Sequence, residues 1–383
     1  MLALSAGRAT AADPSPPPNA FLAVGGDNVE LPRDDLGPDE EVAFWARIQA
    51  DLQRLRADGM LAAPDAAQTV FYAWPVRLAP GLTDYAGFYV SAFSDHNPAV
   101  GAWQDYNGGT RTYDTHRGTD IALWPFSWNK LDSGDVQVVA AAAGTIVQRE
   151  NITPADHNCG AGSGGLGNWI VLSHADGRIT IYGHMKYNSL TAKGVGQTVG
   201  LGEYLGTVGS AGNSSGPHVH FEARTALGGS ELWTDPFTGP SNPVASGWLS
   251  QLPYYDSAIN KVATGTAFPQ NEPCLPTVTH LQDRFPAAAH IAFHVYYRAY
   301  QGGLPTQLTI FNPAGGIYQS WSYTDNVYPF LAAAGRYWSM DFPADAPSGA
   351  WRFRAVYNGQ TYETPFWVNA PISPTLYLPD LHR

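Results

Sequence analysis

The sequence has little charge and no long apolar run, and each shortage excludes a class of protein. Charged residues make up 14% of the 383 residues, and the net charge is −12. Nucleic-acid binding depends on clustered Lys and Arg, and no basic block is present. No apolar stretch approaches the roughly 20 residues that cross a bilayer. We therefore expect neither a nucleic-acid partner nor a membrane span.

Cysteine is almost absent as well. The two cysteines, Cys159 and Cys274, do not form a Cys-x-x-Cys pair. In an exported protein an even count favours one disulfide, with two unrelated thiols as the alternative. The first 13 residues, MLALSAGRATAAD, resemble the end of a signal peptide with a small-residue cleavage site, although a disordered tail would read similarly. Both features favour export.

Glycine, proline and aromatic residues are abundant, which is typical of strands and turns. The chain has 40 Gly, 30 Pro and 13% aromatic residues. We therefore predict a mainly β protein of antiparallel sheets. One helix is expected from Pro38, because Trp45, Ile48 and Leu52 recur on one helical face and Gly59 is a suitable C-terminal stop.

Changes in local composition and hydrophobic pattern divide the chain into segments. Short β-like runs begin near residue 70, and Ala175–Gly177 between two of them has the composition of a hairpin turn. A second set of alternating runs follows residue 276 and suits a small β-sandwich. The first predicted segments are a truncated signal and linker at 1–35 and a helical segment at 36–69. A β domain with the candidate site follows at 70–246, and then a connector at 247–275. The last two segments are a β-sandwich-like accessory domain at 276–370 and a tail at 371–383.

Three short segments carry residues that packing alone would not require. They are HRGTD at 116–120, YGH at 182–184 and GSAGNSSGPHVHFE at 209–222. In the third, Val219 and Phe221 favour a strand. Alternate side chains leave the same face of a strand, so His218 and His220 point together while the two apolar residues point into a core.

The first segment could complete a metal site. Gly118 and the apolar residues after Asp120 favour a loop that enters a strand. Imidazole and carboxylate groups suit zinc, and catalytic zinc sites usually have three protein ligands. His116, Asp120 and His220 would make such a set, although each piece alone is a weak signal. No His-Glu-x-x-His helix is present, so a glutamate base of that type is absent.

Together, HRGTD, YGHM and GNSSGPHVHFE resemble the three motifs of the lysostaphin/LytM-type zinc metallopeptidases over roughly residues 70–245. The resemblance implies one Zn²⁺ bound by His116, Asp120 and His220. It also implies that His184 and His218 are catalytic histidines that do not bind the metal. The implied activity is hydrolysis of peptide bonds in bacterial peptidoglycan, in the stem peptide or cross-bridge, through a zinc-activated water. Which of His184 and His218 is the base stays open.

Two departures from the family pattern leave the cleaved bond open. They are the lengthened segment 125–135 and the loop around Cys159, both expected at the rim of a groove. Tyr113 and Asn107 precede the first motif and could line that groove, but a surface position is the simpler interpretation.

Other functions compete with the peptidoglycan endopeptidase. Some proteins of this type have lost their ligands and act as cell-wall-binding or hydrolase-activating proteins, whereas this sequence keeps every ligand. A general secreted protease for Gly-rich proteins is a further alternative. We expect a monomer, located outside the cell or in the periplasm and cell envelope of a bacterium, with peptidoglycan peptides as its partners.

The roles of the flanking segments also stay open. The N-terminal helix is either an inhibitory pro-segment or plain support. The second β domain could bind glycans of the wall, dock on the groove or serve secretion. Its aromatic residues Trp321, Tyr323, Trp338 and Trp351 could stack on sugars, although the inward faces of a sandwich need such residues too.

Overall fold

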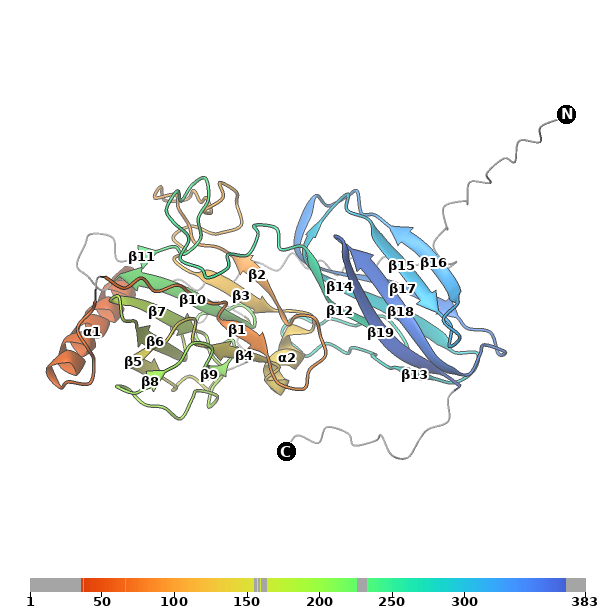
Figure 1. Ribbon diagram of the computed structural model, residues 1–383, viewed down its shortest axis with the longest axis horizontal. Helices are drawn as coiled ribbons and strands as arrows, with labels where there is room; N and C mark the ends of the chain where they lie inside the picture. The colour runs from red at the N-terminus through yellow and green to blue at the C-terminus, as the bar shows by residue number, and fades with distance from the viewer. Residues whose placement is uncertain are drawn as a thin grey trace.

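The computed structural model describes residues 36, 38–65, 67–154, 157, 159, 164–225 and 233–369. Strands predominate, and the two halves of the chain lie end to end along the long axis of the molecule (Figure 1). The expected mainly β fold with an N-terminal helix is confirmed. The proposed signal remnant and C-terminal tail lie outside the described residues. No helix in the described part is long and apolar enough to cross a membrane.

The first half is built on an eight-stranded antiparallel sheet. Its strand order is β2-β3-β10-β7-β6-β5-β8, and β11 pairs with Ala223 and Arg224 near the end of β10. The strands are β2 (Phe88–Ala92), β3 (Thr119–Leu123), β5 (Gly144–Glu150), β6 (Trp169–Ser173), β7 (Arg178–Gly183), β8 (Thr198–Val199), β10 (His218–Thr225) and β11 (Trp233–Thr234). The predicted hairpin turn joins β6 to β7, and its Gly177 has a φ of 84° that glycine adopts without strain.

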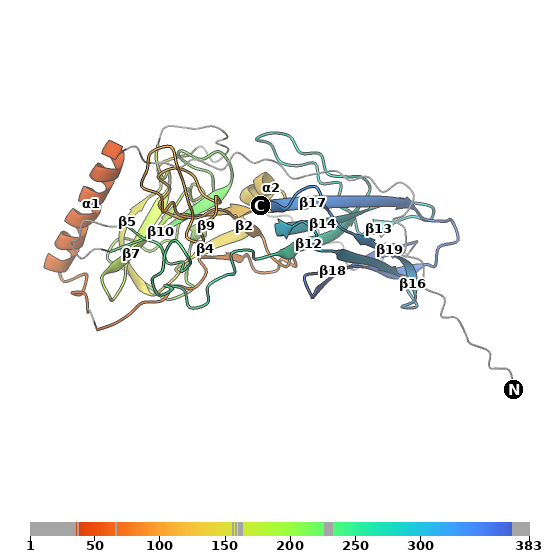
Figure 2. The same ribbon diagram turned by 90° about the horizontal axis from the view of Figure 1, so that it is seen from above.

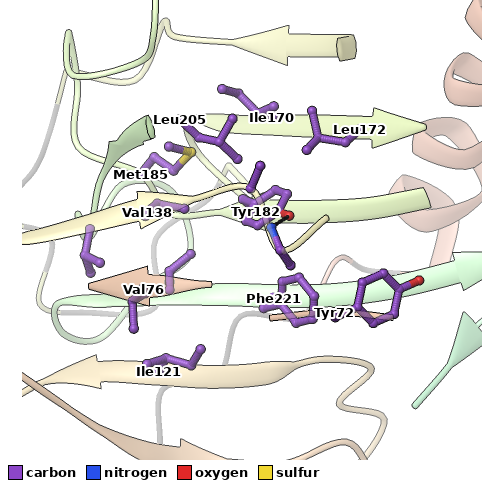
Figure 3. Close-up of a cluster of buried hydrophobic side chains, with 14 of the residues drawn as sticks. Tyr72, Val76, Ile121, Val138, Ile170, Leu172, Tyr182, Met185, Leu205 and Phe221 are labelled. Atoms are coloured by element: carbon purple, nitrogen blue, oxygen red, sulfur yellow. Dashed lines mark hydrogen bonds between the residues drawn. The ribbon is translucent and has the colours of Figure 1, made fainter. Parts of the chain in front are cut away.

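Different elements cover the two faces of this sheet. A three-stranded sheet of β1 (Val76–Leu78), β4 (Val136–Val139) and β9 (Tyr204–Thr207) packs on one face. Val138 and Leu205 from it meet Ile170, Tyr182 and Phe221 from the large sheet in the main core (Figure 3). Burying this apolar surface supplies the main driving force for folding of this half.

Helix α1 (Pro38–Ala57) covers part of the opposite face, at one end of the molecule (Figures 1 and 2). Its Ile48, Leu52 and Leu55 pack against Trp169 and Val171 of β6. The helix therefore follows the predicted apolar face, which lies on the large sheet. A short second helix, α2 (Ser127–Ser133), follows β3 and falls within the lengthened segment 125–135.

The second half consists of two packed sheets, as predicted for the β-sandwich. One has the order β12-β14-β17 and the other β13-β19-β18-β15-β16, antiparallel except for the β13–β19 pair. The strands are β12 (Ala258–Gly265), β13 (Arg284–Phe285), β14 (His290–Gln301), β15 (Thr306–Phe311), β16 (Ile317–Tyr323), β17 (Phe330–Asp341), β18 (Gly349–Tyr357) and β19 (Gln360–Val368).

The aromatic residues considered for sugar stacking belong mainly to the interior of this half. Trp321, Trp338 and Trp351 are at most 2% exposed and lie in one core cluster, while Tyr323 packs at its edge. Strand β12 lies within the stretch that we predicted as a connector. A register shift between Ile259 and Lys261 breaks its alternation and hides the strand pattern.

Several contacts tie the two halves together. Asn260 of β12 donates to the carbonyls of Phe88 and Trp124 at 2.7 and 3.2 Å. Asp84 pairs with the buried Lys130 at 2.7 Å and also with Lys261 across the seam. The chain additionally forms the Cys159–Cys274 disulfide, as predicted, with the two Cα atoms 5.5 Å apart.

Candidate metal centre

Three of the predicted site residues converge on neighbouring strands. Asp120 lies on β3, and the strand register places His220 of β10 directly opposite it. His116 lies in the loop that enters β3, as the sequence predicts. All three side chains are buried, and each offers one donor atom within 4.8 Å of the others. Among the described residues this is the one cluster of three or more His, Cys, Asp or Glu suited to a metal ion.

The spacing of the three donor atoms fits zinc. His116 Nε2 and His220 Nδ1 each lie 3.2 Å from Asp120 Oδ1, and they lie 3.4 Å from each other. Three donors at about 2.0–2.2 Å from one tetrahedral zinc lie roughly 3.3–3.6 Å apart. Two imidazoles and a carboxylate are also ligands that zinc accepts. The donor set therefore matches the metal in chemistry, and its distances of 3.2–3.4 Å come within about 0.1 Å of that range.

Contacts behind His116 fix its ring. Its Nδ1 donates to the carbonyl of Phe93 at 2.6 Å, which leaves Nε2 as the donor atom that faces the cluster. Tyr113 stacks on the imidazole with ring centroids 4.3 Å apart, and its hydroxyl donates to Asp120 Oδ2 at 3.3 Å. The tyrosine is thus buried in the site. The simpler interpretation from sequence, a surface position, is wrong for Tyr113.

His184 and His218 lie beside the cluster. Their rings are 4.6 Å apart, and His218 Nε2 is 3.8 Å from Asp120 Oδ1. His184 Nδ1 donates to the carbonyl of Ala211 at 2.7 Å, and His218 Nδ1 donates to that of Gly216 at 2.8 Å. Since a neutral imidazole has one protonated nitrogen, these bonds leave both Nε2 atoms as proton acceptors.

The backbone around these two histidines is tightly constrained. His184 follows β7 with a φ of 57°, a left-handed conformation that is unusual for a non-glycine residue. Its carbonyl partner Ala211 is followed by Gly212, where an added Cβ would lie 2.4 Å from the Gly167 nitrogen. The Gly-rich loops at 164–167 and 209–216 can therefore pass close together and hold the imidazoles in place.

Two charged residues that the sequence analysis did not single out continue the polar face of β10. Glu222 and Arg224 are 3% and 1% exposed, and Arg224 Nε donates to Glu222 Oε1 at 2.6 Å. Burial alone would raise the pKa of Glu222. The Arg224 guanidinium and the hydrogen bond from His220 outweigh burial and lower this pKa to about 2. The sequence signal was their i+2 and i+4 spacing from His220.

The centre is thus a buried pair of histidines and one aspartate, flanked by two further histidines, on an antiparallel sheet. Residues 114–232 match the model of Peptidase family M23. This part of the chain is accordingly a domain of Peptidase family M23, the lysostaphin/LytM-type metallopeptidase family.

Curated relatives match this region over short stretches. The DD-carboxypeptidase/endopeptidase Mpg of Neisseria meningitidis serogroup B is 46% identical over 61 residues, which are 16% of this chain and 13% of that protein. The peptidoglycan DD-endopeptidase ShyA of Vibrio cholerae is 31% identical over 113 residues, 30% of this chain and 21% of that protein. The matches thus span about a fifth of these relatives' length or less.

Among solved structures, the catalytic domain of lysostaphin from Staphylococcus simulans shares 25% identity with this chain. The match covers 40% of this chain and 88% of that domain, with a TM-score of 0.24.

Proposed function

We propose that this protein is a secreted zinc-dependent endopeptidase that hydrolyses peptide bonds in bacterial peptidoglycan. One observation carries the proposal: His116, Asp120 and His220 present their donor atoms to one point at 3.2–3.4 Å from one another, with His184 and His218 beside them. In this proposal the first three residues hold one Zn²⁺ per chain. When bound, zinc acts as a Lewis acid that lowers the pKa of water and polarises a carbonyl.

His184 and His218 handle the proton. Each has Nδ1 bonded to a backbone carbonyl, so the neutral ring has its lone pair at Nε2. One Nε2 takes the proton of the attacking water and passes it to the leaving amine. The other histidine takes up a second proton from solvent before the reaction, so that its Nε2–H can donate to the oxyanion that develops on the scissile carbonyl; it keeps this proton throughout. Because both rings are held by the same kind of hydrogen bond, the contacts do not distinguish the base from the oxyanion donor. Kinetic measurements on variants of the two histidines would distinguish them.

The names of two relatives support a substrate class. Mpg and ShyA are named for carboxypeptidase and endopeptidase activity, ShyA on peptidoglycan. Because residues 114–232 match Peptidase family M23 and are similar to parts of these proteins, we assign wall peptides as the substrate. The Cys159–Cys274 disulfide supports a place outside the cytoplasm, because disulfides persist in oxidising compartments.

Metal analysis combined with mass spectrometry of digested peptidoglycan tests this proposal. We expect one zinc per chain and new termini within the stem peptide or cross-bridge. A Gly-rich protein digested in parallel should be cleaved far more slowly. A zinc-loaded protein that leaves wall peptides intact would contradict the proposal and favour a wall-binding or hydrolase-activating protein. Preferential cleavage of the Gly-rich protein would favour a general protease.

A further inference from the structure

His220 has a polar contact on the side away from the other two donors. While Nδ1 faces Asp120 and His116, Nε2 lies 3.6 Å from Glu222 Oε2. A histidine that binds a metal usually directs its other ring nitrogen to a carboxylate or carbonyl, and that contact sets the tautomer and the ring orientation. Glu222 is therefore placed to keep the Nδ1 lone pair of His220 directed at the metal.

Glu222 is itself held by Arg224. Both residues lie on the His220 face of β10, two and four positions further along the strand. The 2.6 Å bond from Arg224 Nε engages Oε1 of Glu222, which leaves Oε2 for His220. The carboxylate thus bridges the arginine and the histidine.

The last contact comes from helix α1. Glu41 Oε1 accepts a hydrogen bond from Arg224 Nη1, and the Arg224 guanidinium lies over the Trp45 ring at 5.5 Å from its centroid. Glu41 also pairs at 2.8 Å with Arg117, the residue after His116. One carboxylate of the helix therefore touches both chain segments that supply the histidine donors.

We propose that α1 is a positioning element of the metal centre, acting through Glu41, Arg224 and Glu222 on the imidazole of His220. This inference rests on the proposed function, since it takes the three donors to bind zinc. The alternative interpretation is that α1 only covers the apolar surface formed by Trp169 and Val171. Packing by Ile48, Leu52 and Leu55 would then affect stability, and the charge of Glu41 would not affect the metal.

Zinc affinity of the full chain separates the two interpretations. We would measure the dissociation constant of zinc by competition with a chromogenic chelator. Loss of a residue that supports a metal ligand typically weakens metal affinity by about 10–100-fold, which we expect for Glu222→Gln. For Glu41→Gln, one contact further from the metal, we expect the low end of that range, about 10-fold.

Asp58→Asn is the matched control. Asp58 follows the far end of α1, is exposed, and contacts only Arg54 among the ion pairs of the described residues. It loses the same charge and should bind zinc like the wild type. Because Glu41 acts through Glu222, the double variant Glu41→Gln/Glu222→Gln should bind zinc about as weakly as Glu222→Gln alone. Additive losses would mean that Glu41 acts by a separate route.

A second measurement covers the case in which Glu222→Gln fails to fold. In the metal-free protein, ¹⁵N NMR of His220 should show protonated Nε2 in the wild type, with loss of this preference in Glu41→Gln. A Glu41→Gln variant with wild-type zinc affinity and an unchanged His220 spectrum would overturn the inference, even if its melting temperature fell. Absence of zinc binding in the wild type would overturn the proposed function together with this inference.

Discussion

The two faces of strand β10 are equally buried but chemically opposite. Val219, Phe221 and Ala223 lie in the main apolar core, while His218, His220, Glu222 and Arg224 form the polar face toward the metal centre and α1. Apolar side chains gain stability from burial, whereas buried polar groups need partners. We therefore expect one face to determine the fold and the other the proposed chemistry, so that substitutions on them affect different measurements.

The largest effect is expected for His220→Ala. Removing one of three donors should abolish zinc binding, and activity should fall below detection. Zinc content and muropeptide hydrolysis check both outcomes. His290→Ala, at an exposed histidine of β14, is the control and should change neither. Retention of zinc by the His220 variant would break the contrast between the faces.

His184→Ala should separate metal binding from catalysis. His184 lies outside the donor set, so the variant should keep its zinc. Loss of a group that transfers a proton should lower turnover by about 10²–10⁴-fold. Turnover on a defined wall peptide, measured beside zinc content, checks this prediction. Near-normal turnover would remove His184 from the catalytic groups and leave His218 as the candidate.

On the apolar face, Phe221→Ala should affect stability. Phe221 is 1% exposed and contacts Tyr72, Tyr182 and Trp248. Truncation leaves a cavity that costs about 3–5 kcal/mol of unfolding free energy. Urea denaturation measures that loss, and zinc titration of the folded protein should give an affinity within about threefold of wild type. A large loss of affinity at unchanged stability would show that the faces are not independent.

A buried charge where the two halves meet should affect stability without affecting the metal. Burial would raise the pKa of Asp84, but Lys261 and Lys130 outweigh it and lower this pKa below its ordinary value. The resulting stabilisation is present above the ordinary value of about 3.9 and is lost as the pH falls through the lower folded value. Asp84→Asn should cost about 3 kcal/mol at neutral pH, since it leaves Lys130 short of a partner.

Urea midpoints at several pH values test the sign of this effect. The difference in stability between wild type and Asp84→Asn should be constant near neutrality and shrink below about pH 4. Zinc affinity should equal that of the wild type. A difference that grows on acidification would contradict the assigned direction of the pKa.

Local sequence patterns predicted much of this structure. The i, i+3, i+7 pattern located α1, and the His-x-His alternation correctly predicted that His218 and His220 share a face of β10. Strand β12 was not predicted, because its bulge interrupts the alternation of inward and outward side chains. The first part of β17 carries little sequence signal, because Ala332, Ala333 and Ala334 have low β-propensity. Pairing with the long β14 makes this part a strand.

The charged contacts behind the site could not be predicted in the same way. Glu41 and Arg224 are separated by 183 positions, and their pairing depends on how α1 lies on the sheet. The periodicity of apolar residues within a helix or strand carries no information about such a long-range contact. Tyr113 was misjudged for a related reason, because its burial results from the packing of a loop against His116.

X-ray absorption spectroscopy at the zinc edge tests the central claim most directly. For the purified wild type, the donor set predicts one zinc per chain with two imidazoles and only oxygen as further ligands, at about 2.0–2.2 Å. The Asp120→Asn variant, which lacks the carboxylate donor, should contain no bound zinc. A wild-type protein without bound zinc, or a spectrum with one imidazole or with sulfur ligands, would contradict the assignment of His116, Asp120 and His220 as the metal centre.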